Sequence, residues 1–130
     1  MNKLSDYITF NSDGLVPVIA QEYKSNIVLM LAYASKEALD YTVETGKATY
    51  FSRSRNKIWC KGEESGNYQQ IVDIRIDCDN DTVLYIVKLM GLKAACHTGH
   101  KSCFYTSYKE NSLIENDKKL YFSPEDVYKK

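Results

Sequence analysis

The chain has 130 residues, of which 44% are hydrophobic and 26% are charged, a composition typical of one globular domain with its own core. Lysine plus arginine equals aspartate plus glutamate, at 17 each, so no overall charge attracts nucleic acid or an anionic membrane. The N-terminus is polar, and the longest apolar stretch, 27–34, is too short to cross a bilayer. We therefore expect a cytoplasmic protein, whose four cysteines indicate metal binding, catalysis or burial more than disulfides.

The first predicted elements are two strands, 15–23 and 27–33, which form a β-hairpin. Both are rich in Val, Ile and Leu, and the polar residues 24–26 separate them. Pro17 has no N–H to donate to a neighbouring strand, which predicts that the first strand lies at the edge of its sheet.

One helix is predicted after the hairpin, at about 35–45. Ser35 suits its N-cap, Glu37 lies in its first turn, and Gly46 suits the position just after its last turn. Strands are then expected at 48–54, 70–77 and 83–90. The predicted fold class is α+β, with mainly antiparallel strands and this one principal helix.

The last 25 residues differ in composition from the rest. After Tyr105 the chain is polar and rich in lysine, which predicts a domain at 1–105 and a peripheral extension at 106–130. Ser123 followed by Pro124 is typical of a helix start, so a short helix is expected there.

A cluster of cysteine and histidine lies at 96–103. It places Cys96, His97, His100 and Cys103 within eight residues, and Cys78 lies upstream in a turn. Thiolate sulfur and imidazole nitrogen are the ligands that zinc prefers, although buried cysteines without a metal would give the same pattern. A histidine beside a ligating cysteine is well placed to transfer protons near neutral pH, which favours His97 over His100. Cys60, which stands alone, is interpreted as a structural residue.

An acidic turn joins the strands predicted at 70–77 and 83–90. If strand geometry continues into it, Asp77, Asp79 and Asp81 project to one side and Cys78 to the other. Carboxylate oxygens suit Mg²⁺, whereas Asp-Asn-Asp is also ordinary turn chemistry. The spacing excludes an EF-hand, because Thr82 and Lys88 stand where that loop needs Gly and Glu.

A basic segment precedes a glycine-containing loop. Arg53 and Arg55, placed on a strand end, would face the same side and could bind a phosphate. Trp59 offers a flat surface to a base, and the small residues of the loop 61–67 allow backbone N–H groups to approach an anion. A solvated basic face beside a core tryptophan would look similar.

Four motifs resemble, in identity, order and spacing, those of the phosphoribosyl-AMP cyclohydrolase family. They are Ser52-Arg53-Ser54-Arg55, Trp59-x-Lys61-Gly62-Glu63-x-Ser65-Gly66-Asn67-x-Gln69, Asp77-Cys78-Asp79-x-Asp81 and Ala95-Cys96-His97-Thr98-Gly99-x-x-Ser102-Cys103-Phe104. The resemblance extends from about Asp13 to Tyr105. The pyrophosphohydrolase domain acting on phosphoribosyl-ATP that is fused to some members is not found in this chain. We therefore expect the preceding step of histidine biosynthesis to belong to another protein.

The resemblance implies an intertwined homodimer with one zinc per subunit. Cys96 and Cys103 would hold the metal together with Cys78 of the other subunit, and the aspartates 77, 79 and 81 would bind Mg²⁺. We expect His97 to be catalytic, and the nucleotide substrate to be bound by Arg53, Arg55, Trp59, Lys61, Ser65 and Asn67.

The implied reaction is hydrolysis of a C–N bond in a cyclic amidine, the N1–C6 bond of the adenine ring of 1-(5-phosphoribosyl)-AMP. A zinc-dependent nucleotide deaminase uses related chemistry, but its H-x-E signature is missing because His97 is followed by Thr98 and Gly99. A second alternative is a non-catalytic nucleotide-binding module that zinc stabilises.

Overall fold

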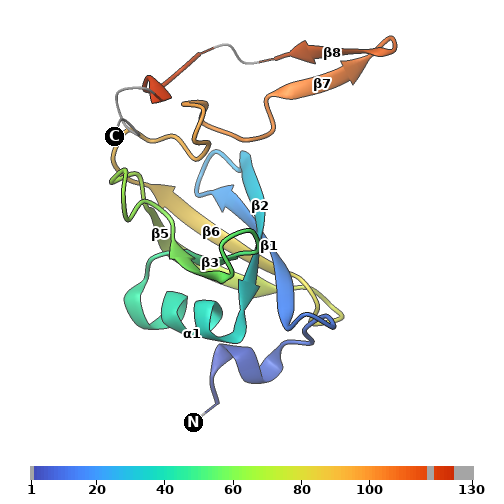
Figure 1. Ribbon diagram of the computed structural model, residues 1–130, viewed down its shortest axis with the longest axis vertical. Helices are drawn as coiled ribbons and strands as arrows, with labels where there is room; N and C mark the ends of the chain where they lie inside the picture. The colour runs from blue at the N-terminus through green and yellow to red at the C-terminus, as the bar shows by residue number, and fades with distance from the viewer. Residues whose placement is uncertain (1, 117–118, 125–130) are drawn as a thin grey trace.

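The computed structural model describes residues 2–116 and 119–124, and one mixed sheet forms its centre (Figure 1). The sheet has six strands in the order β4-β3-β2-β1-β6-β5. The strands are β1 (Leu15–Glu22), β2 (Val28–Ser35), β3 (Thr49–Ser52), β4 (Lys57–Cys60), β5 (Gln69–Ile76) and β6 (Val83–Leu89). The paired neighbours are antiparallel except for β1 and β6, which run parallel. Together with one α-helix, α1 (Lys36–Thr45), this confirms the predicted α+β class.

The predicted hairpin and helix are both present. β1 pairs with β2 through the turn at 23–27, as the polar residues there predicted. The Ser35 hydroxyl accepts a hydrogen bond from Ala38 N at 3.2 Å and so caps the helix start. Gly46 ends the helix at φ 75°, a left-handed conformation that favours glycine. None of the helices in the described residues is long and apolar enough to span a membrane.

The prediction that Pro17 marks an edge strand is wrong. β1 lies inside the sheet, between β2 and β6. Pairing with β6 begins only at Val18, so Pro17 has a partner residue on the β2 side, Tyr33, and none on the β6 side. A central strand therefore accommodates the proline because the neighbouring strand starts one residue later.

Alternating residues of the two central strands form the core. These two strands are β1 and β6, which are neighbours in the interior of the sheet: Val16, Val18 and Ala20 of β1, and Val83, Tyr85 and Val87 of β6, are all fully buried. α1 covers this face with Ala38, Leu39 and Thr42. The sheet curls, because Ala48 N donates to Gln69 O at 2.9 Å and Ile71 N donates to Gly46 O at 2.8 Å, which joins β5 to the segment before β3.

Four further elements were not predicted. The residues 4–7 form a short 3-10 helix, η1 (Leu4–Tyr7), and β4 forms a hairpin with β3. In the C-terminal extension, β7 (Thr106–Lys109) and β8 (Ser112–Glu115) form a separate two-stranded hairpin that projects beyond the sheet (Figure 1). The short helix expected from Ser123 falls almost wholly at 125–130, outside the described residues.

Candidate active site

A cavity of about 680 Å³ opens beside the β3–β4 hairpin. Five of the predicted site residues line it, namely Arg55, Trp59, Lys61, Ser65 and His97. They come from three separate segments: the β3–β4 hairpin, the loop that follows it, and the loop after β6. Only the folded chain brings the basic segment and the cysteine and histidine cluster to one wall.

The two arginines do not share a face, which corrects the expectation from strand geometry. β3 ends at Ser52, so both residues lie in the turn before β4, where side chains no longer alternate. Arg53 stacks its guanidinium over the Tyr33 ring, 4.2 Å from the ring centroid. Arg55 instead lines the cavity.

Trp59 belongs both to the core and to the cavity. Its ring packs against the buried Tyr50, with 5.7 Å between ring centroids, and its other surroundings include the cavity and the Lys61 ammonium at 5.3 Å. Trp59 can therefore fill part of the core and also offer the cavity-lining surface of its ring to a base.

The loop 61–67 is held by its own backbone. Gly62 has φ 90°, and a Cβ there would meet Tyr68 N at 2.3 Å, so the close approach requires glycine. Asn67 is buried and accepts a hydrogen bond from Leu92 N at 2.9 Å, which ties this loop to the segment after β6. Its side-chain nitrogen is the buried polar atom without a partner among the described residues. Ser65, by contrast, lines the cavity.

Two thiols lie together beside the cavity. Loss of water around the Cys103 thiol raises its pKa to about 12, although the residue as a whole is exposed. The neighbouring Cys96 thiol, which is in hydrogen-bonding reach, raises it further, and the Lys61 ammonium opposes the rise. Burial in turn lowers the pKa of Lys61, and the two cysteines partly offset this. A lysine therefore stands next to the thiol pair as a counter-charge.

Backbone hydrogen bonds close the loop that contains these thiols. Ala95 N donates to Lys101 O at 2.9 Å, and Cys96 N donates to His100 O at 3.1 Å. Cys103 N donates to Leu29 O at 2.7 Å, which attaches the end of the loop to the first residues of β2. Cys96 is 6% exposed, and it is the group whose charge and hydrogen bond act on the Cys103 thiol.

Cys78 lies far from that pair within one chain. It is exposed in the turn at the Ile76 and Val83 end of the β5–β6 hairpin, and its thiol donates to Asp79 Oδ1 at 3.3 Å. The loop containing Cys96 follows the opposite end of β6, and Figure 1 shows the two segments at opposite ends of that strand. Among the described residues, no three His, Cys, Asp or Glu side chains come together as a metal site.

The acidic turn brings two carboxylates together in a way that strand geometry did not predict. β5 ends at Ile76, so the alternation stops before Asp77. Desolvation would raise the pKa of Asp77, but hydrogen bonds from Asp81, Thr82 and Asp79 lower it. The pKa of Asp81 is raised, first by its side-chain hydrogen bond with Asp77, as expected when two carboxyl groups share a proton.

The two histidines differ in their surroundings. His97 is exposed and lines the cavity. His100 is 6% exposed and stacks on the Tyr105 ring, with 3.6 Å between the ring centroids. The structure thus separates an accessible imidazole from a buried one.

Comparison with known proteins decides the family. Residues 30–105 match the family model described as phosphoribosyl-AMP cyclohydrolase. A phosphoribosyl-AMP cyclohydrolase of Methanospirillum hungatei is 53% identical over 123 residues, which cover 95% of this chain and 89% of the relative. A relative of the same name from Haloquadratum walsbyi is 55% identical over 121 residues, covering 93% and 87%.

The chain belongs to the phosphoribosyl-AMP cyclohydrolase family. The resemblance inferred from the four motifs is therefore confirmed. A further relative, the histidine biosynthesis bifunctional protein HisIE of Thermoanaerobacter pseudethanolicus, is 51% identical over 128 residues, which cover 98% of this chain. The chain spans 58% of that bifunctional relative.

Several cavity residues of this family member were not among the predicted site residues. They are Phe51, Ser52, Ser54, Gly62, Glu64 and Pro124. The two serines could have been found from the sequence, because they alternate with the arginines in a motif already identified. In the structure their hydroxyl oxygens lie 3.3 Å apart. Pro124 indicated only a helix start and not a site residue, since it comes from the extension, whose sequence matched no family motif.

Proposed function

We propose that the chain is a zinc-dependent phosphoribosyl-AMP cyclohydrolase that opens the adenine ring of 1-(5-phosphoribosyl)-AMP in the cytoplasm. The observation that carries the proposal is the placement of His97 on the wall of a cavity beside the Cys96 and Cys103 thiols, in a chain of this family. A volume of about 680 Å³ lies in the range of small-molecule sites.

Two soft sulfur donors side by side fit zinc better than they fit Mg²⁺ or Ca²⁺. Bound zinc would supply the Lewis acidity that activates a water near neutral pH. We propose that the third ligand is Cys78 of a second copy, because within one chain that cysteine is exposed and remote from the pair. Dimerisation would then complete the site, with one zinc per subunit.

The side chains of the cavity suit the nucleotide. Arg55 and Lys61 would pair with its phosphates, Trp59 would pack against the purine, and the Ser65 hydroxyl would hydrogen-bond a polar edge. Arg53 would have to leave its stacking on Tyr33 to reach a phosphate. Asn67 would act indirectly, by holding the loop through Leu92.

In the proposed reaction, the oxygen of water bonds to C6 and the N1–C6 bond breaks. His97, protonated, would donate to N1 as it leaves, and the exocyclic nitrogen would stay on the product as part of a carboxamide. The product is the formimino-carboxamide ribotide, and no ammonia is released. Asp77 and Asp81, with Asp79 between them, would bind Mg²⁺, since two adjacent carboxyl groups repel each other unless a proton or a cation lies between them.

Ultraviolet absorbance tests the reaction class. Zinc-loaded protein given 1-(5-phosphoribosyl)-AMP with Mg²⁺ should show the spectral change of ring opening without ammonia. Chelation of zinc should abolish the change, and added zinc should restore it. Ammonia release would indicate a deaminase. An unchanged absorbance spectrum with metal-loaded protein would indicate the non-catalytic module.

His97→Ala is expected to lower kcat by about 10²- to 10⁴-fold, the range for loss of a general acid. KM and zinc content should change little, because the side chain is exposed and faces the cavity without supporting the fold. Steady-state kinetics and metal analysis on the same preparation check both points. A variant with near-normal kcat would remove His97 from the proton-transfer role.

A further inference from the structure

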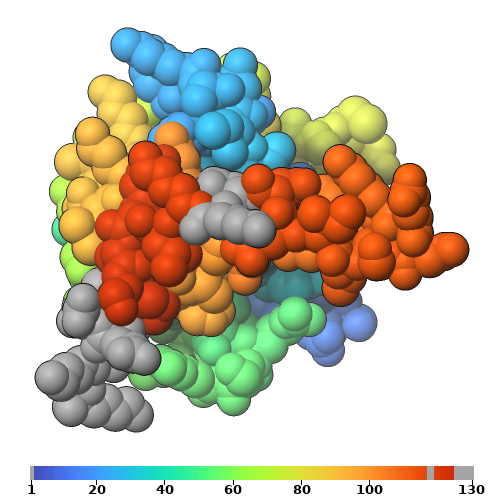
Figure 2. Space-filling view, turned by 90° about the horizontal axis from the view of Figure 1, so that it is seen from above, coloured from blue at the N-terminus to red at the C-terminus, as the bar shows by residue number. Residues whose placement is uncertain are grey.

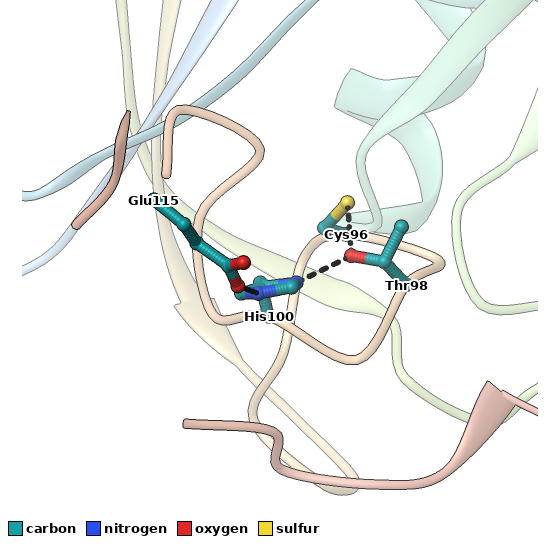
Figure 3. Close-up of polar contacts among 4 residues, drawn as sticks. All are labelled: Cys96, Thr98, His100 and Glu115. Atoms are coloured by element: carbon teal, nitrogen blue, oxygen red, sulfur yellow. Dashed lines mark hydrogen bonds and ion pairs between the residues drawn. The ribbon is translucent and has the colours of Figure 1, made fainter. Parts of the chain in front are cut away.

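The buried His100 connects the extension to one of the two paired thiols. Thr98 Oγ1 donates to Cys96 Sγ at 3.0 Å and lies 2.7 Å from His100 Nδ1 (Figure 3). The other ring nitrogen, Nε2, lies 2.8 Å from Glu115 Oε1. A continuous chain of hydrogen bonds therefore runs from the last residue of β8 to the sulfur of Cys96.

The donor directions in this chain follow from the number of protons available. A threonine hydroxyl has one proton, and it points at Cys96 Sγ, so Thr98 Oγ1 must accept from His100 Nδ1–H. The contact from the other ring nitrogen, Nε2, to Glu115 Oε1 extends the network into β8. Tyr105, stacked parallel to the ring within 1°, fixes the plane in which both nitrogens point.

The two thiols are thus held by different means. Cys103 is attached through its main chain to Leu29, whereas the sulfur of Cys96 is oriented by a side-chain network whose far end lies in the hairpin β7–β8. The extension also contacts this loop directly: Tyr121 N donates to Gly99 O at 2.8 Å. Figure 2 shows the segments 106–116 and 119–124, orange to red, spread over this end of the molecule.

We propose that Thr98, His100 and Glu115 are positioning residues that orient Cys96 for metal binding, and that the hairpin β7–β8 therefore belongs to the metal site. The inference rests on the proposed zinc dependence. Residues that hydrogen-bond to a metal ligand and orient it typically change metal affinity or activity by about 10- to 100-fold when they are replaced. The extension that composition predicted to be peripheral would thus help to orient a metal ligand.

Zinc affinity, measured by competition with a chromophoric chelator, tests the proposal without relying on turnover. Thr98→Val keeps the shape of the side chain and removes its hydroxyl, whereas Thr98→Ser keeps the hydroxyl. We expect Thr98→Val and His100→Ala each to weaken zinc binding by about 10- to 100-fold, and Thr98→Ser to bind within about threefold of the unaltered protein. The double variant Thr98→Val/His100→Ala should be no weaker than the worse single one, because both interrupt the same chain.

Glu115→Ala should also weaken zinc binding, and Glu115→Gln, which keeps an accepting oxygen, should recover much of the loss. Glu110→Ala is the matched control, because it removes the same charge from the turn of the same hairpin. Thermal unfolding of the metal-free proteins separates positioning from general destabilisation. Unchanged zinc affinity in Thr98→Val, His100→Ala and Glu115→Ala would overturn the inference even if the unaltered protein binds zinc and turns over, whereas an unaltered protein without zinc affinity would overturn the proposed function itself.

Discussion

Cys96→Ser is expected to lower kcat at least about 10³-fold and to strip zinc from the purified protein. The reason is that a serine hydroxyl is a much poorer zinc ligand than a thiolate, and that loss of the metal removes the Lewis acid that brings the pKa of water close to neutrality. Metal analysis and the absorbance assay on one preparation measure both effects. Circular dichroism establishes that the variant is folded.

Cys60→Ser provides the matched control for that substitution. Cys60 is half-buried in β4 and its thiol lies 4.0 Å from Lys61 O, with no other cysteine as its partner in the described residues. It should retain zinc and keep kcat within about twofold, since it takes no part in the proposed site. If Cys96→Ser behaved like Cys60→Ser, the assignment of the thiol pair to zinc would be untenable.

Mixing two inactive variants, Cys78→Ser and Cys96→Ser, is expected to restore activity. If each site takes Cys96 and Cys103 from one copy and Cys78 from the other, a mixed dimer has one intact site and one site that lacks two ligands. Random exchange makes about half of the dimers mixed, so about a quarter of the normal activity and zinc content should return. Each variant alone should have neither.

The expected recovery depends on exchange of subunits, which is tested separately. Differently tagged copies, purified for the presence of both tags, should show one zinc per dimer. Mixing Cys96→Ser with Cys103→Ser is the control, because those two residues lie on the same chain and each mixed dimer then has no intact site. Mixed dimers of Cys78→Ser and Cys96→Ser that stay inactive and metal-free would show that the site is not shared in this way.

Local sequence was sufficient for the elements that depend on neighbouring residues. The helix start follows from Ser35, whose hydroxyl accepts from Ala38 N, and its end follows from Gly46 at positive φ. The hairpin of β1 and β2 follows from two apolar runs around a short polar turn. For Cys96 and Cys103, local spacing left a metal site and simple burial both open, and the family resemblance favoured the metal site.

Residues at the ends of these elements were harder to place. The arginines at 53 and 55 were expected on a strand, but β3 ends at Ser52 and the turn separates their side chains. The alternation expected for the acidic segment failed for the same reason, since β5 ends at Ile76. Periodicity describes the middle of a strand, and it gives no information once backbone pairing ends.

What the sequence determined by itself was the family, through motifs that keep their order, and the elements set by contacts within a few residues. The tertiary structure decided the position of β1 inside the sheet, the cavity shared by Trp59 and His97, the distance of Cys78 from the other thiols, and the contact of Glu115 with His100. Those features join segments far apart in the chain. They depend on how strands pair and on which surfaces pack together, and such pairing leaves no local pattern in the sequence.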